Sequence, residues 1–163
     1  MFVNINKTLK MSAICIITAA VGATTSAANP AQYYKVNDAD VATIPVTVEL
    51  GALQVHEAPL YVSIQKRDEY MGIHGYGGVI QAVSSETMSA TFKVDTAGDY
   101  AVSVWHDLNN DGVFSMDDNY QILDGWGASG NVPVNRRPKF EDVMVKVETY
   151  GATVPVMLKY PSK

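Results

Sequence analysis

Apolar and polar residues alternate with a period of two along most of the chain after residue 41. In the first such segment, Val46, Val48 and Leu50 alternate with Thr47 and Glu49, which predicts a strand with one buried face. The pattern recurs in seven short segments: Val46–Leu50, Leu60–Ile64, Val79–Val83, Ala90–Val94, Tyr100–Val104, Val143–Val147 and Val154–Leu158. Short strands separated by turn residues predict an all-β fold, an antiparallel β-sandwich of about seven strands.

Turn residues and prolines refine this prediction. Tyr150-Gly151 predicts a tight hairpin between the last two strands. Pro45 and Pro155 each lie inside a predicted strand. Because proline has no N–H to donate to a ladder, these strands are expected to lie at sheet edges or to begin at the proline. Tyr100 is expected to pack at a strand corner and to bond its hydroxyl to the backbone.

The first residues have the pattern of a secretory signal. Lys7 and Lys10 precede the apolar run Met11–Val21, and small residues follow up to Ala28. The run is too short to span a bilayer, so no membrane span is expected. We predict a cleaved signal peptide over residues 1–27, a leader over 28–40 and a single domain over 41–163. The protein is therefore expected to be exported, to the periplasm or the cell exterior.

Charge and composition narrow the classes of partner. The chain has 12 Lys and Arg against 17 Asp and Glu. Removing residues 1–27 takes away two lysines and no acid, so 10 − 17 gives a net charge of −7. An acidic domain is a poor candidate for binding nucleic acid. The single Cys15 lies within the signal, so neither disulfides nor thiol chemistry are expected in the domain.

The connection between the fifth and sixth predicted strands, from His106 to Asp142, is much longer than the others. Structureless connections beyond about 15 residues are uncommon in compact domains and often carry function. This one opens with Asp-Leu-Asn-Asn-Asp-Gly-Val-Phe-Ser-Met-Asp-Asp over residues 107–118. Oxygen-bearing side chains at positions 1, 3, 5, 9 and 12, with glycine at position 6, match the spacing of a calcium loop.

The hypothesis is a calcium ion held by the side chains of Asp107, Asn109, Asp111, Ser115 and Asp118 and by the carbonyl of Val113. Calcium is a hard cation that prefers six to eight oxygen ligands. Gly112 allows the sharp turn, and Phe114 is expected to anchor the loop to the core. The loop follows a strand rather than a helix and ends in aspartate rather than glutamate. The alternative is a polar turn whose side chains bond their own backbone.

Several of these segments together resemble one bacterial family. The strand Gly98–Asp107, the Asn/Asp/Gly-rich segment after it, Gly125–Asn131 and Pro138–Asp142 are similar in order and residue type to the exported family called domain of unknown function 2141. The resemblance covers roughly Val46 to Tyr160. It implies a transthyretin-like or immunoglobulin-like sandwich and no established activity.

Other residues with possible chemistry give weaker patterns. Trp126, within Gly-Trp-Gly-Ala-Ser-Gly, either covers one end of the sandwich or forms a platform for a sugar or peptide. A Ser-His-Asp triad of a hydrolase could be drawn from Ser129, His106 and Asp142. Nothing in the spacing of these residues requires such a triad. A solvated loop is the favoured interpretation of the basic residues Arg136, Arg137 and Lys139. The three histidines, His56, His74 and His106, are scattered without ligand spacing.

These patterns favour a non-enzymatic, exported binding or accessory module whose calcium-ordered loop contacts a protein or glycan at the cell envelope. The alternative is a structural or assembly protein of the envelope that binds no metal. A hydrolase is the third and least favoured class.

Overall fold

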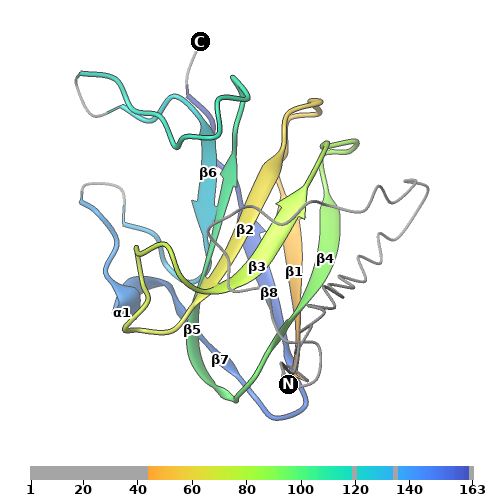
Figure 1. Cartoon of the computed structure of the whole chain (residues 1–163), viewed down its shortest axis with the longest axis vertical. Coiled ribbons are helices and arrows are strands. Elements are labelled where there is room, and N and C mark those ends of the chain that lie inside the picture. The colour runs from red at the N-terminus through yellow and green to blue at the C-terminus, as the bar shows by residue number, and fades with distance from the viewer. Residues whose placement is uncertain (1–43, 119–120, 134–135, 162–163) are drawn as a thin grey trace, which may run out of the picture.

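The structure, a computed structural model, describes residues 44–118, 121–133 and 136–161. Two β-sheets face each other, as the alternating pattern predicted (Figure 1). The smaller sheet has the order β4-β1-β8, and the larger has β3-β2-β5-β6 with β7 also paired to β5. The elements are β1 (Ile44–Gly51), β2 (Leu60–Gln65), β3 (Tyr76–Ile80), β4 (Met88–Val94), β5 (Gly98–His106), β6 (Gly125–Ala128), α1 (Phe140–Val143), β7 (Met144–Val147) and β8 (Ala152–Met157).

The core lies between the two sheets. Alternate residues of β1, Val46 and Val48, are fully buried, and their polar neighbours face outward. They meet the inward side chains of the larger sheet, such as Val62 of β2 and Val102 of β5. Burying one such aliphatic side chain contributes about 1.5–3 kcal/mol. The apolar positions of the period-two pattern are therefore the residues that form this core.

Most strand pairs are antiparallel, but β1 and β8 pair in parallel, from Val46↔Ala152 to Gly51↔Met157. The expectation is confirmed for Pro155. It is not met for Pro45, because β1 is the central strand of the smaller sheet and begins at Ile44. Pro155 lies on β8, at the edge of the smaller sheet. Pro45 is the second residue of β1 and precedes the stretch that pairs with β8.

Three details differ from the prediction. The long connection contains an eighth strand, β6, which escaped detection because its four residues include two glycines. The third strand lies at Tyr76–Ile80 instead of 79–83, since Gly78 belongs to the sheet, where an added Cβ would come within 3.2 Å of the Phe92 ring. The turn at Glu148–Gly151 exists, but β7 and β8 belong to different sheets and form no hairpin.

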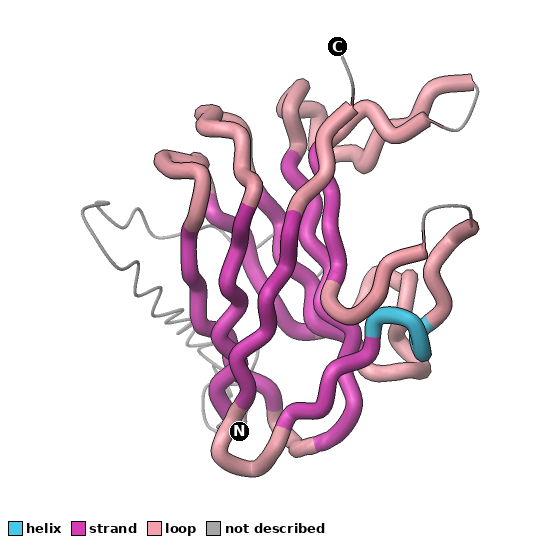
Figure 2. Tube along the Cα trace, turned by 180° about the vertical axis from the view of Figure 1, so that it is seen from behind, coloured by secondary structure: helices cyan, strands magenta, loops and turns pink. Residues whose placement is uncertain are grey.

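The loops after β5 and before β6 extend from one end of the sandwich (Figure 2). A bridge between Trp126 of β6 and Lys159 joins the larger sheet to the segment that follows β8. Within the part of the chain that is described, no helix is both long and apolar enough to cross a membrane. The predicted signal peptide and leader lie outside the described residues.

Candidate functional site

The predicted calcium loop begins at a buried carboxylate. Asp107 directly follows β5 and is fully buried. One of its oxygens accepts a hydrogen bond from the Asp111 N–H (3.2 Å) and the other from the Gly112 N–H (2.8 Å). Gly112 has a φ of 74°, a left-handed conformation that glycine adopts at little cost. Asp107 therefore closes the turn of the loop from inside.

A second set of contacts gathers around the Asp111 carboxylate. The Asn109 amide nitrogen donates to Asp111 Oδ2 at 2.7 Å, and the Ser115 hydroxyl lies 3.4 Å from the same oxygen. The Ser115 hydroxyl also lies 3.1 Å from the Val113 carbonyl. Together with the bond from the Asp111 N–H to Asp107, these contacts connect five of the six predicted ligand residues. Asp118 lies in an exposed turn outside this network.

Each residue of this set carries an oxygen atom, the ligand type that calcium prefers. An ionised carboxylate offers about four lone-pair sites, and each Asp107 oxygen receives one backbone N–H. The Asn109 amide now points its nitrogen at Asp111, and a half-turn of that amide would present oxygen instead. Within the described ranges, no three His, Cys, Asp or Glu side chains come together as a metal-binding group. An ion here would therefore depend on amide, hydroxyl and carbonyl oxygens as well as on carboxylates.

A buried acid that the sequence reasoning missed holds the two ends of the loop together. Asp124 is 1% exposed. Its carboxylate accepts hydrogen bonds from the N–H of Leu108 at 3.1 Å, the N–H of Ser115 at 2.9 Å and the Trp105 indole N–H at 3.1 Å. No spacing rule relates Asp124 to the loop, although it is the one acid between Asp118 and Glu141.

The last part of the loop forms one strand of a small hairpin, in which residues 115–117 pair with residues 121–123. Met116 and Ile122 form a bridge, and the N–H of Leu123 donates to the Ser115 carbonyl at 3.0 Å. Phe114 is 39% exposed and meets the edge of Trp105, with ring centroids 6.1 Å apart. The expectation that Phe114 anchors the loop to the core is therefore wrong, because it packs on the outer face of the larger sheet.

His106, the last residue of β5, is hydrogen-bonded through one of its two nitrogens. Its Nδ1 lies 2.8 Å from the Tyr160 hydroxyl, which also accepts the Gln54 N–H at 3.0 Å. The Nε2 atom is buried and has no hydrogen-bond partner among the described residues. Burial, aided by the neighbouring His56, lowers the pKa of His106, which favours the neutral imidazole.

Ser129 and Asp142, the other two residues considered for a hydrolase, are engaged elsewhere. The Ser129 hydroxyl accepts the Val102 N–H at 3.0 Å and donates to the Val143 carbonyl. Asp142 accepts two hydrogen bonds from Arg136, at 2.6 and 2.7 Å. That guanidinium holds the pKa of Asp142 at about 2. Part of the basic cluster is thus paired within the chain.

The family model described as "Uncharacterized protein conserved in bacteria (DUF2141)" matches residues 48–154. The chain belongs to this family. The DUF2141 match runs from β1 into β8 and so includes both sheets and the loop. No curated protein and no solved structure gives a significant match.

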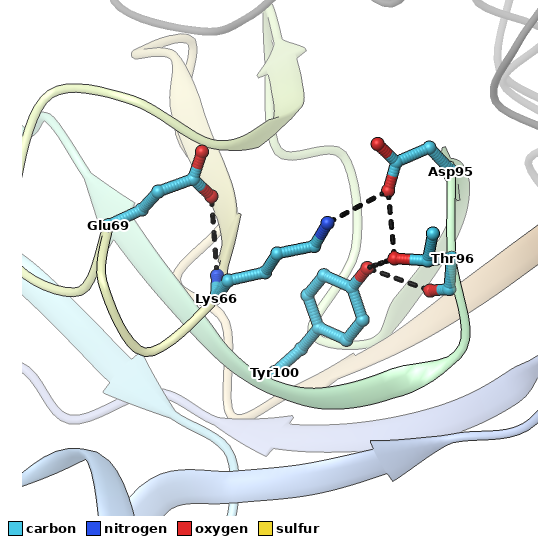
Figure 3. A network of polar contacts seen from close by, with 5 residues as sticks. All are labelled: Lys66, Glu69, Asp95, Thr96 and Tyr100. Atoms are coloured by element: carbon cyan, nitrogen blue, oxygen red, sulfur yellow. Dashed lines mark hydrogen bonds and ion pairs between the residues drawn. The ribbon is translucent and has the colours of Figure 1, made fainter.

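A second polar cluster, drawn in Figure 3, surrounds the β4–β5 turn of the DUF2141 sandwich. Figure 1 shows this turn at the end away from the segment between β5 and β6. The Tyr100 hydroxyl donates to the Thr96 carbonyl at 2.8 Å, which confirms the expected tie to the backbone. Lys66 Nζ forms an ion pair with Asp95 at 3.0 Å. Burial, then a hydrogen bond to Asp95, raises the pKa of Tyr76, so this tyrosine keeps its proton and donates it. The cluster fixes the β4–β5 turn.

This cluster makes stability depend on pH. The hydrogen bond from Tyr76, followed by that from Lys66, holds the pKa of Asp95 at about 2, below its usual 3.8. The ionised Asp95 carboxylate therefore stabilises the folded state fully above about pH 4, and this stabilisation is lost as pH falls toward 2. Lowering the pKa of Asp95 by one unit corresponds to about 1.4 kcal/mol of stabilisation. Solvent screening reduces this value because the Asp95 side chain is 27% exposed.

We expect Asp95→Asn to lower the free energy of unfolding by about 1–2 kcal/mol at pH 7 and by clearly less at pH 3. Urea unfolding at the two pH values measures this difference. The control is Asp68→Asn, which changes an exposed acid on the neighbouring loop. It should show no such pH dependence. An equal loss for Asp95→Asn at both pH values would contradict the assignment.

Proposed function

We propose that this DUF2141 protein is an exported, non-enzymatic binding or accessory module whose 107–118 loop is ordered by calcium. The single observation that carries the proposal is the network of oxygen-bearing residues around Asp111. Asn109 and Ser115 both contact one oxygen of Asp111, and Ser115 also contacts the Val113 carbonyl. If calcium bound here, the ion would take the place of the Asn109 and Ser115 hydrogens that now face Asp111 Oδ2.

The strand and the buried acids support this proposal because they hold part of the site in place. Asp107 is positioned by β5 and by two loop amides, and Asp124 fixes Leu108 and Ser115 at the two ends of the loop. Such support lowers the entropy that is lost when an ion binds. Asp118 would complete the ligand set by moving inward. Affinities of about 10⁻⁴–10⁻³ M are typical of extracellular calcium modules.

The test is a titration of the purified protein with calcium, magnesium and a chelator, followed by calorimetry and thermal melting. We expect millimolar calcium to raise the melting temperature, since a ligand that binds only the folded state stabilises it. Asp111→Ala should abolish the response. Glu86→Gln, which changes an exposed acid between β3 and β4 that is not a predicted ligand, should retain it. If the native protein shows no response to millimolar calcium, the proposed site is wrong.

One observation favours a second candidate, an envelope structural or assembly protein that binds no metal. Asp107 and Asp124 together accept four backbone N–H groups of the loop, which gives the loop an internal means of support. Capture of partners from envelope extracts, with and without chelator, separates the two candidates. Calcium-dependent capture supports the calcium-ordered module, and capture that is unaffected by chelator supports the assembly protein.

A further inference from the structure

The two tryptophans of the domain lie side by side on the larger sheet but have different surroundings. Trp105 of β5 and Trp126 of β6 are directly opposite each other in the strand register. Trp105 stacks on Tyr61 at 4.4 Å between ring centroids and donates its indole N–H to Asp124. Among the described residues, Trp126 has neither a ring contact nor a hydrogen bond from its indole. Its ring is only half-buried.

Trp126 lines an open groove of about 450 Å³. One wall is the returning strand of the small hairpin, residues 121–124, and the other is formed by Tyr160 and Pro161. Small-molecule sites have volumes of roughly 300–1,000 Å³. The groove is therefore large enough for a small ligand, and it brings together segments separated by more than thirty residues in the chain.

The Tyr160 wall of the groove is held rigidly. The Tyr160 hydroxyl is bonded to both His106 and Gln54. Its ring lies so close to Gly125 that an added Cβ would come within 2.3 Å of a ring carbon. Trp126 is fixed by its two backbone bonds to Lys159, at 2.9 and 2.7 Å. Two aromatic residues are thus held in place before any ligand arrives, which lowers the entropic cost of binding.

We propose that this groove binds an uncharged oligosaccharide, with Trp126 as the surface on which a sugar ring stacks. A sugar ring presents C–H groups on its faces, and an indole binds such a face through its negative π-surface. The hydroxyls at the ring's edge need polar partners, which the Gln121 side chain and the free Trp126 N–H provide at the groove. Gln121, Asp124 and Tyr160 place polar groups beside the Trp126 ring in the lining of the groove, which suits a sugar better than an apolar ligand.

The surrounding charge selects an uncharged sugar over an anionic one. The Asp124 carboxylate is among the groups that line the groove, and the whole chain has a net charge of −5. This negative charge opposes the binding of uronic acids, sulfated sugars and phosphates.

This inference rests on the proposed function, because the groove and the calcium loop share the small hairpin. The outgoing strand of the hairpin contains Ser115, a proposed calcium ligand. It is bonded to the returning strand through the Leu123 N–H and through the bond from Asp117 N–H to the Gln121 carbonyl, at 2.9 Å. Ordering the loop with calcium therefore sets the position of one groove wall, and calcium is expected to strengthen sugar binding.

The test uses protein expressed from the full chain and a panel of hexasaccharides of glucose, mannose and N-acetylglucosamine, with oligogalacturonate as the anionic probe. We expect calorimetry to detect at least one uncharged oligosaccharide in the presence of calcium and to detect no oligogalacturonate. Trp126→Ala should weaken binding at least tenfold, and Trp126→Phe should weaken it less. Tyr150→Ala removes an aromatic ring that is 83% exposed at the far end of the sandwich and should leave affinity unchanged.

Each outcome separates the two proposals. Binding that survives Trp126→Ala, or a preference for oligogalacturonate, overturns the groove assignment. If calcium stabilises the protein and no uncharged oligosaccharide binds, the groove inference fails while the calcium loop stands. If sugar binds through Trp126 equally well with chelator, the groove stands and its coupling to the calcium loop is wrong. The calcium titration alone decides whether the loop binds the ion. Circular dichroism of Trp126→Ala checks that lost affinity does not result from unfolding.

Discussion

Asp124→Ala is expected to lower the free energy of unfolding by about 3–4 kcal/mol. The substitution removes a buried carboxylate that accepts the Leu108, Ser115 and Trp105 N–H groups. A hydrogen bond to a charged group contributes about 1.5–3 kcal/mol, and a buried donor left without a partner adds a desolvation cost. The expected loss is below the sum of three bonds because water reaches part of the opened loop. Urea unfolding in the presence of chelator measures it without any contribution from calcium.

Asp124→Asn is the matched control, because it keeps the size of the side chain and one acceptor oxygen. It should lose less stability than Asp124→Ala. Amide hydrogen exchange should accelerate at Leu108 and Ser115 in both variants. Both amides exchange through local opening, so they should respond even where the core strands report only the change in global stability. A loss below about 1 kcal/mol for Asp124→Ala would show that the loop does not depend on this carboxylate.

Gly77→Ala is expected to destabilise the protein by about 3 kcal/mol or more. Gly77 has a φ of 140°, and a Cβ at this position would lie 1.9 Å from the Val62 carbonyl oxygen. Relief of that clash requires β3 to move away from β2, which breaks the antiparallel pairing between them. Overpacking at a rigid backbone costs about 1–3 kcal/mol, and the backbone conformation adds a further cost. Chemical denaturation measures the total.

Gly98→Ala separates the two causes. Gly98 has a φ of 154°, but no atom lies within 4 Å of an added Cβ. It should therefore show the conformational cost without the clash and should lose about 1–2 kcal/mol. Equal losses for Gly77→Ala and Gly98→Ala would contradict the close approach of Gly77 to β2.

The fold was largely predictable because core positions alternate along most of each long strand. In β1, for example, each second side chain from Val46 to Leu50 is buried. The pattern failed at β6 and at the start of β3. There, glycines such as Gly127 and Gly77 replace side chains, and the reason is contact with another strand's backbone. Such contacts are properties of the tertiary structure, so no local pattern records them.

The candidate site was predictable only where its residues are close in sequence. The spacing from Asp107 to Ser115 identified residues that do contact one another. Asp124 and Tyr160 were missed because they approach the loop and His106 from later segments of the chain. The parallel register of β1 and β8 was missed for the same reason, since a strand's pattern shows which face is buried and not which neighbour it has.

The parallel pairing of β1 with β8 also affects how the domain is assembled. The first and last strands of the domain meet, so the smaller sheet lacks its third strand until residues 152–157 have been synthesised. Ordering such distant partners requires closure of a loop of about a hundred residues, which slows folding. The nascent polypeptide therefore remains incompletely folded until residues 152–157 are available to pair with β1, a state in which chaperones have time to bind it.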